Sequence, residues 1–130
     1  MKILVIDDSE NILSFTKNLL EKIGIEKYIL TEKSHDTLLI LEDSFEANEP
    51  IDLIISDFLM PDFTGLDVVK AVRNYEGSNK SIKDIPILIS TAEAEINSMM
   101  EMINEGASDY IVKPFTKDQL DEKIKKIIKL

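Results

Sequence analysis

Five short apolar runs, each followed by a segment with helical spacing, constrain the fold of this chain more than any other feature of its sequence. The runs are rich in branched residues and almost continuously apolar, which is typical of strands covered on both faces of a parallel sheet. They are Lys2–Ile6, Tyr28–Leu30, Ile51–Ser56, Pro86–Ser90 and Tyr110–Lys113. Five strand–helix units with right-handed crossovers predict an α/β fold, with helices on both faces of one parallel sheet.

The helices are predicted from apolar residues at three- and four-residue intervals between the strands. The first carries Ile12, Phe15, Leu19 and Ile23 and stops at Gly24, the second covers about Ser34 to Leu41, and the third covers Gly65 to Tyr75. The fourth carries Ile96, Met99, Met100 and Ile103 and ends at Gly106, and the fifth opens with Thr116 and Gln119 at capping-box spacing. Met102 falls outside the Ile96–Met99–Ile103 face, so we expect it to be exposed and available to a partner.

Length and composition restrict the domain count and the partners. A chain of 130 residues predicts one domain, covering 1–130, and no apolar run is long enough to span a membrane. The absence of cysteine fits a reducing environment, so we expect a soluble protein of the cytoplasm. The 25 acidic residues outnumber the 15 basic ones, which argues against direct binding to nucleic acid.

Charged and hydroxyl side chains follow four of the predicted strands. Asp7 and Asp8 follow the first, Asp57 the third, Thr91 the fourth, and Lys113 ends the fifth. Because all strands of a parallel sheet end at the same edge, where open α/β sheets bind ligands, we expect these residues to meet.

Three carboxylates at one edge predict a cation. Two such charges about 4 Å apart repel by about 4 kcal/mol at an effective dielectric constant near 20. A cluster with only oxygen ligands suits Mg²⁺ or Ca²⁺ better than Zn²⁺. Because Asp7, Asp8 and Asp57 are too few for a closed cage, Mg²⁺ that retains waters and meets a phosphate is the better fit.

Four motifs in order resemble those of response-regulator receiver domains of two-component signalling, chemotaxis regulators in particular. They are "IDDS" after the first strand, "SDFLMPDFTG" after the third, "STAE" after the fourth and "YIVKPF" around the fifth. Each motif alone is common, but all four at predicted strand ends are specific. The resemblance covers essentially the whole chain and implies a flavodoxin-like sheet with strand order 2-1-3-4-5.

The resemblance also implies a role for each matching residue. Asp57 is implied as the phosphoacceptor, with Lys113 contacting the phosphoryl group and the Lys113–Pro114 peptide bond cis. The implied Mg²⁺ ligands are Asp7, Asp8, Asp57 and the backbone carbonyl of Leu59. Thr91 matches the switch hydroxyl and Tyr110 the aromatic switch position. The implied phosphodonor is a sensor histidine kinase or a phosphotransfer protein.

Each of these residues also has a purely structural interpretation. Asp7 and Asp8 could cap the first helix, Asp57 could form a turn, Thr91 could line the turn before the fourth helix, and Lys113 could be a solvated strand end. Together these interpretations require four coincidences. His35, the only histidine, lacks a motif around it and is predicted to be a surface residue rather than a phosphodonor.

Other functional classes fit the sequence less well. A phosphatase of the haloacid dehalogenase type needs a second carboxylate two residues after its nucleophile, but Ser9 follows Asp7 in that position. A flavin-binding domain would need a phosphate loop where "DDSENI" places acidic residues.

We therefore expect a stand-alone receiver that catalyses only its own phosphorylation and dephosphorylation. It would act through a protein-binding face on the fourth helix, fifth strand and fifth helix, and a phosphorylation-dependent dimer is a further expectation. An excised receiver of a larger regulator or hybrid kinase, or a phosphorylation-independent binding module, is the alternative.

Overall fold

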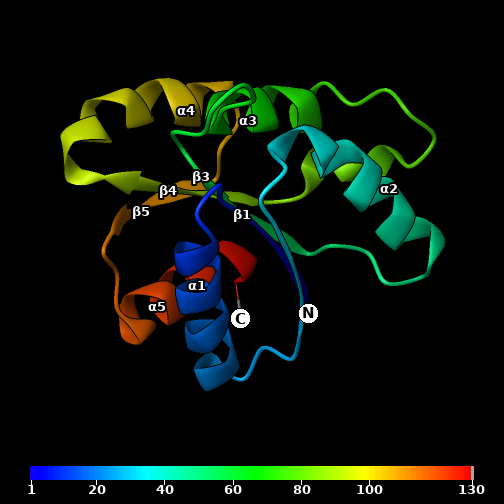
Figure 1. Cartoon of the computed structure of the whole chain (residues 1–130). Coiled ribbons are helices and arrows are strands. Elements are labelled where there is room, and N and C mark those ends of the chain that lie inside the picture. Colours follow the sequence, from blue (N-terminus) through cyan, green and yellow to red (C-terminus); the bar gives the residue numbers. More distant parts are fainter. Residues whose placement is uncertain (130) are drawn as a thin grey trace.

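A single parallel sheet forms the centre of the molecule (Figure 1). The structure is a computed structural model and describes residues 1–129. Its strands are β1 (Lys2–Ile6), β2 (Lys27–Thr31), β3 (Leu53–Asp57), β4 (Ile87–Ala92) and β5 (Asp109–Lys113). They lie in the order β2-β1-β3-β4-β5, and all four neighbouring pairs are parallel. The predicted architecture and strand order are confirmed.

Helices cover both faces of the sheet. In Figure 1, α2 (Thr37–Glu46), α3 (Gly65–Arg73) and α4 (Met99–Glu105) lie on one face, and α1 (Glu10–Ile23) and α5 (Lys117–Ile128) on the other. Short 3₁₀ segments precede α2 (Ser34–Asp36), β4 (Lys80–Asp84) and α4 (Glu93–Ser98). The predicted capping box of α5 is present, because the Thr116 side chain accepts from the Gln119 amide and the Gln119 side chain accepts from the Thr116 amide.

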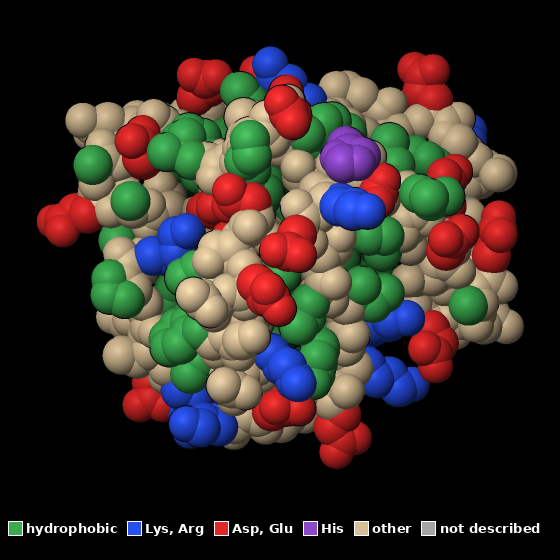
Figure 2. Space-filling model, viewed as in Figure 1, with side chains coloured by type: hydrophobic (Ala, Val, Ile, Leu, Met, Phe, Trp, Pro, Cys, Tyr) green, Lys and Arg blue, Asp and Glu red, His purple; other side chains and the backbone are tan. Residues whose placement is uncertain are grey.

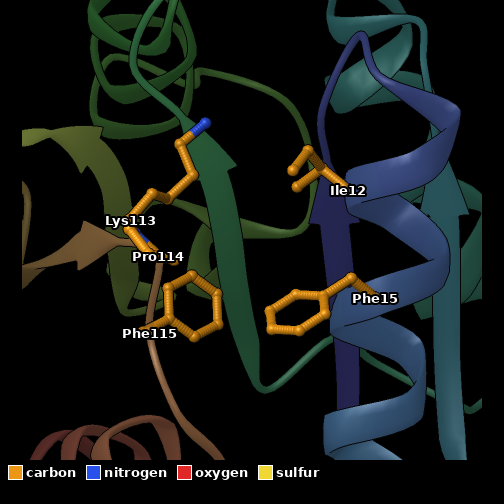
Figure 3. Close-up of a pocket in the computed structure, with 5 residues that line it drawn as sticks. All are labelled: Ile12, Phe15, Lys113, Pro114 and Phe115. Carbon is orange, nitrogen blue, oxygen red and sulfur yellow. The ribbon is translucent and has the colours of Figure 1, made fainter.

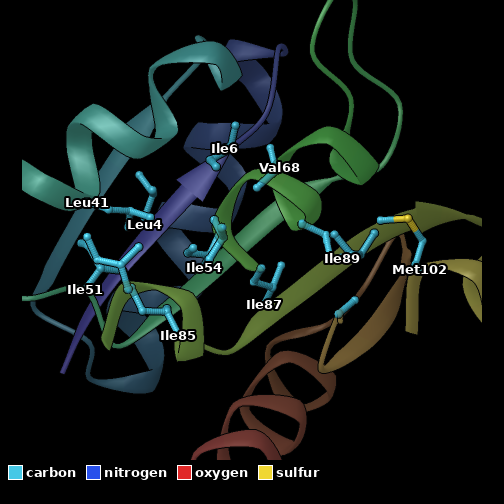
Figure 4. Close-up of a cluster of buried hydrophobic side chains, with 14 of the residues drawn as sticks. Leu4, Ile6, Leu41, Ile51, Ile54, Val68, Ile85, Ile87, Ile89 and Met102 are labelled. Atoms are coloured by element: carbon cyan, nitrogen blue, oxygen red, sulfur yellow. The ribbon is translucent and has the colours of Figure 1, made fainter. Parts of the chain in front are cut away.

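Two hydrophobic clusters, one on each face, hold the layers together. On β1, Leu4 and Ile6 belong to the cluster under α2, α3 and α4, whereas Ile3 and Val5 belong to the cluster over α1 and α5. Figure 4 shows the first cluster, in which strand side chains meet Leu41, Val68 and Met102 from three helices. Because side chains alternate along a strand, continuous apolar runs are needed to fill both clusters.

The buried face of α1 differs from the predicted one. Leu13, Thr16, Leu19 and Leu20 are buried, whereas Phe15 is 42% exposed and Ile12 is only half-buried. The helix has two overlapping faces of suitable spacing, and the face containing the smaller, polar Thr16 lies against the sheet. Apolar character alone therefore assigned Phe15 to the wrong face.

The buried face of α4 is also different, and Met102 is the clearest correction. Met102 is 1% exposed and Met99 is 2% exposed, whereas Met100 is 71% exposed. Ile96 and Ile103, which were predicted to be buried, are exposed as well. The six residues Glu93–Ser98 form a 3₁₀ helix, which has 3.0 residues per turn. Within α4 itself, Met102 and Ile103 both stand at helical spacing from Met99, and the face that packs on the sheet is the one with Met102. Helical spacing alone therefore did not decide which face is buried.

Two further observations concern the surface. No helix within residues 1–129 combines the length and the apolar character that crossing a membrane requires. On the face shown in Figure 2, Lys and Arg side chains are interspersed with Asp and Glu instead of forming a continuous basic area. His35 is exposed, as predicted.

Candidate functional site

The carboxyl ends of β1, β3 and β5 bring the predicted acidic residues and the lysine together. Asp7 follows β1 and is 2% exposed, and Asp57 ends β3 and is 7% exposed. Asp8 is exposed. One carboxylate oxygen from each of these aspartates lies within 4.8 Å of the other two. Residues fifty positions apart in the sequence therefore form one cluster, as predicted from the parallel sheet.

Lys113 supplies positive charge to this cluster. Its Nζ donates a hydrogen bond to Asp57 Oδ1 over 2.8 Å and lies 3.8 Å from Asp7 Oδ2. Lys113 ends β5, and the following peptide bond to Pro114 is cis, as the family resemblance implied. A charge-assisted hydrogen bond of this length fixes the lysine directly beside the Asp57 carboxylate.

The environment of Asp7 disfavours its charged form. Burial is the largest influence and raises the pKa of Asp7 from 3.8 to about 6. The negative charges of Asp57 and Asp8 raise this pKa further, whereas a hydrogen bond from the Ser9 amide and the charge of Lys113 lower it. One lysine therefore does not fully balance three carboxylates.

The donor set fits a magnesium ion. Every side-chain ligand that the cluster offers is a carboxylate oxygen, the donor that Mg²⁺ prefers, and three such oxygens lie close enough together to share one ion. A divalent charge at this position would favour the charged form of Asp7, against the burial and the neighbouring carboxylates that raise its pKa. Residues 1–129 therefore contain a site that suits Mg²⁺ in both charge and chemistry.

The segment after Asp57 lies next to the cluster. The Phe58 amide donates to the Ser90 carbonyl of β4, and the Gly65 amide donates to the Phe58 carbonyl, each over 2.9 Å. A pocket of about 250 Å³ is lined by Asp57, Phe58, Leu59, Ala92 and Lys113. The Leu59 side chain is 56% exposed at this pocket. The Asp57 carboxylate is therefore reachable from solvent although the residue itself is largely buried.

Thr91 and Tyr110 lie on the face of the sheet that α4 covers. Thr91 is 1% exposed and pairs with Val112, while Tyr110 pairs with Ile89 of the cluster under α4. The Thr91 hydroxyl donates to the Ala92 carbonyl over a long 3.3 Å. Tyr110 is half-buried, with Lys123 Nζ 5.4 Å from its ring centroid. The two side chains therefore share one layer but make no direct hydrogen bond to Asp57 among the described residues.

An apolar groove beside Lys113 was not predicted. It is lined by Ile12 and Phe15 of α1 and by Pro114 and Phe115 after β5 (Figure 3). The Phe15 and Phe115 rings are neighbours, with their centroids 6.0 Å apart and their planes tilted by 58°. The exposed Phe15, placed in the core by its spacing, is the sequence signal that could have revealed this surface, but only with knowledge of which face of α1 is buried.

Comparison with known proteins agrees with this geometry. The family model described as "Response regulator receiver domain" matches residues 3–125. The chain belongs to this family. As a receiver, it is 36% identical over 127 residues to the chemotaxis protein CheY of Pseudomonas aeruginosa, covering 98% of this chain and 95% of that protein. It is 34% identical over 128 residues to CheY1 of Helicobacter pylori, covering 98% and 97% of the two chains.

Solved structures show the same receiver fold. The structure of the chemotaxis response regulator CheY4 of Vibrio cholerae matches with a TM-score of 0.77 and 30% identity, covering 97% of each chain. A receiver domain protein of Clostridium thermocellum matches with a TM-score of 0.81 and 30% identity, covering 98% of this chain and 94% of that one. The fold and the family that the four motifs predicted are therefore confirmed over nearly the whole chain.

Proposed function

We propose that this receiver is a phosphorylation-dependent switch in which Asp57 accepts a phosphoryl group from a histidine kinase or phosphotransfer protein. One observation carries the proposal. Asp57 stands beside a hydrogen-bonded lysine and two further aspartates, at a pocket open to solvent. Phosphoryl transfer depends mainly on in-line positioning and on neutralisation of oxygen charge. The open pocket gives a donor access to Asp57, and Lys113 and an ion held by the aspartates would supply the neutralisation.

The residues of the cluster take different roles in this proposal. Asp7, Asp8, Asp57 and the backbone carbonyl of Leu59 would hold Mg²⁺, which when bound neutralises negative charge on the phosphoryl oxygens. Asp57 Oδ forms a new bond to phosphorus as the bond from phosphorus to the donor nitrogen breaks, and the electron pair stays with the imidazole. Lys113, now 2.8 Å from Asp57, would turn its ammonium to the incoming phosphoryl oxygens. The product is an acyl phosphate on Asp57.

The apolar groove supports docking of the phosphodonor. Ile12, Phe15 and Phe115 present apolar surface directly beside Lys113. A donor protein must bring its phosphohistidine to Asp57, so surface next to this lysine would be covered in the complex. Phe15 is the exposed aromatic residue of this groove, whereas Phe115 is buried, and aromatic residues are enriched at the cores of protein interfaces.

The output face is proposed on α4, β5 and α5. A phosphoryl group on Asp57 would offer acceptor oxygens to the Thr91 hydroxyl, whose present bond to Ala92 is long. Movement of Thr91 would alter the layer that it shares with Tyr110 under α4. The outer side of this region carries Ile96, Met100 and Ile103, an exposed apolar stripe that fits a partner. This stripe replaces Met102 as the candidate contact.

The proposal extends to the location of the protein, its domain and its association with other chains. We place the switch in the cytoplasm. Residues 1–130 would form one receiver domain, whose catalytic acts are its own phosphorylation and dephosphorylation. Phosphorylation-dependent dimerisation through the output face is a further possibility for this surface. A phosphorylation-independent binding module is disfavoured because Asp7, Asp8, Asp57, Thr91 and Lys113 are all present.

Covalent labelling tests the proposed function. Acetyl phosphate with Mg²⁺ is expected to add one phosphoryl group, and borohydride is then expected to reduce the acyl phosphate at position 57 to homoserine, as read by peptide mass spectrometry. EDTA and the Asp57→Asn substitution should each abolish the label. Homoserine at another position, or efficient labelling of the Asp57→Asn protein, would contradict the assignment.

Amide exchange tests the output face. Beryllofluoride with Mg²⁺, which mimics the phosphoryl group, is expected to change amide protection in the 3₁₀ segment Glu93–Ser98, in α4, in β5 and in α5. The reason is that a ligand shifts a two-state surface by its differential affinity for the two states. Asp57→Asn is the matched control and should show no change. Changes confined to α1 and α2 would place the output face elsewhere.

A further inference from the structure

The connection between β3 and α3 contains Leu59 and determines where this residue lies. At the base of the connection, main-chain hydrogen bonds tie it to the sheet and close the loop. Phe58 donates to the Ser90 carbonyl, and Gly65 closes back on Phe58. The tip, by contrast, contains a tight turn in which the Phe63 amide donates to the Pro61 carbonyl over 2.7 Å. Asp62 within it has a φ of 67°, in the left-handed region that side chains other than glycine seldom adopt. Such a tip needs an external support to keep one conformation.

Ser34 provides this support from a distant part of the chain. Its hydroxyl donates to the Phe63 carbonyl over 2.6 Å, although the two residues are 29 positions apart. Ser34 is 5% exposed, and the Thr37 hydroxyl in turn donates to the Ser34 carbonyl over 2.6 Å. The short 3₁₀ turn before α2 is thus fixed at its start and holds the loop tip through one buried hydroxyl.

We propose that Ser34 is a positioning residue for magnesium binding and phosphorylation, an inference that rests on the proposed function. Without the hydroxyl, the Phe63 carbonyl loses its donor and the segment 59–63 gains alternative conformations. The apparent affinity for an ion held partly by this segment falls in proportion to the fraction of molecules with the correct loop. Losing a net hydrogen bond lowers the ratio of correct to incorrect loops by up to about tenfold. We therefore expect the affinity for Mg²⁺ to fall measurably, by at most about tenfold.

Four proteins separate this role from a general loss of stability. Ser34→Ala removes the donor, and Ser34→Thr keeps a hydroxyl at the same position. Ser44→Ala, the matched control, removes another buried hydroxyl from the same helical segment, where Ser44 is 4% exposed. The wild-type protein completes the set. Circular dichroism verifies that each protein is folded, and calorimetric titration with MgCl₂ measures the ion affinity. Amide exchange of residues 58–64 is measured without Mg²⁺ and with it.

The expected pattern is specific to the loop. Ser34→Ala should exchange faster at residues 60–64 and bind Mg²⁺ more weakly, by at most about tenfold, with a matching fall in the rate of labelling by acetyl phosphate. Ser34→Thr should recover most of both properties, and Ser44→Ala should retain wild-type affinity and loop exchange. Equal affinity and loop exchange in the Ser34→Ala and Ser44→Ala proteins would overturn the proposal.

Failure of Ser34→Ala to fold and failure of the proposed function can each be distinguished from failure of the Ser34 proposal. If Ser34→Ala does not fold, Ser34→Cys takes its place, because it keeps the side-chain volume but replaces the hydroxyl with a weak thiol donor. Equal Mg²⁺ affinity and loop exchange in the Ser34→Cys and Ser44→Ala proteins would then overturn the proposal. If wild-type protein binds no Mg²⁺ and takes no label, the proposed function fails. The metal-free exchange data would still report whether Ser34 orders the loop.

Discussion

Asp7→Asn is expected to stabilise the metal-free protein and to remove most of the stabilisation that Mg²⁺ gives the wild type. The carboxylate of Asp7 is buried among Asp8 and Asp57, with Lys113 as the nearby cation. Asparagine keeps an oxygen for the Ser9 amide, which now donates to Asp7 Oδ1 over 2.9 Å, but carries no charge. A pKa raised from 3.8 to about 6 corresponds to about 3 kcal/mol. Because Lys113 loses a partner, we expect a gain of about 1–2 kcal/mol at pH 7.5.

The sign of the pH dependence follows from the same shift. Between pH 3.8 and about 6, Asp7 binds more protons in the folded state than in the unfolded state. Its contribution to the free energy of unfolding is therefore fully present below pH 3.8 and is lost as the pH rises through about 6. The advantage of Asp7→Asn over the wild type in EDTA should grow over this interval and then level off.

Magnesium should reverse the order of the two proteins. Binding to the folded state stabilises the wild type by mass action, whereas the variant lacks one carboxylate ligand. Thermal and urea unfolding with EDTA and with MgCl₂ measure both effects. Asp118→Asn changes the net charge equally, at a side chain that is 94% exposed, and should show neither effect. An Asp7→Asn protein that is destabilised in EDTA, or that keeps the full response to Mg²⁺, would contradict this account of the cluster.

The fold could be predicted because burial on two faces leaves a direct sequence signal. Lys2–Ile6 was predicted with its observed bounds, since every apolar residue of this strand enters one of the two clusters. Ile51 is also buried, but it lies outside β3, which starts at Leu53. Apolar character indicates that a residue is buried, but not that it pairs with a neighbouring strand. The start of this strand was therefore predicted two residues too early.

The convergence of site residues could be predicted for a different reason. A parallel sheet places the ends of β1, β3 and β5 at one edge, so the meeting of Asp7, Asp57 and Lys113 follows from topology without any contact being known. Their chemical roles came from the family resemblance and remain predictions. The geometry supplies the 2.8 Å hydrogen bond between Lys113 and Asp57 that makes these roles concrete.

Contacts between distant segments and the buried face of α4 could not be predicted. The bond from Ser34 to Phe63 joins two polar loops that leave no periodic pattern in the sequence. Met102 and Ile103 both stand at helical spacing from Met99, and packing against the sheet decides that Met102 is the buried one. Both features depend on tertiary packing, which overrides local preference.

Gly65→Ala is expected to disturb the phosphoacceptor itself. A Cβ at Gly65 would lie 2.6 Å from the Asp57 carbonyl oxygen and 2.9 Å from the Phe58 Cα, and both are backbone atoms that cannot rotate away. The start of α3 must therefore move from the end of β3, or the end of β3 must move instead. Overpacking of this kind costs about 1–3 kcal/mol of unfolding free energy.

The effect on phosphorylation should exceed the effect on stability. A displacement of about 1 Å at a reacting group can lower a rate about a hundredfold, because in-line geometry is lost. Gly24→Ala is the matched control: its φ of 102° is unfavourable for alanine, but no atom lies within 4 Å of the added Cβ. It also stands at the other end of α1 from the acidic cluster. Gly24→Ala should therefore lose stability and keep the wild-type rate of labelling by acetyl phosphate, whereas Gly65→Ala should lose both. Equal labelling rates in the two variants would mean that the contact between α3 and β3 does not position Asp57.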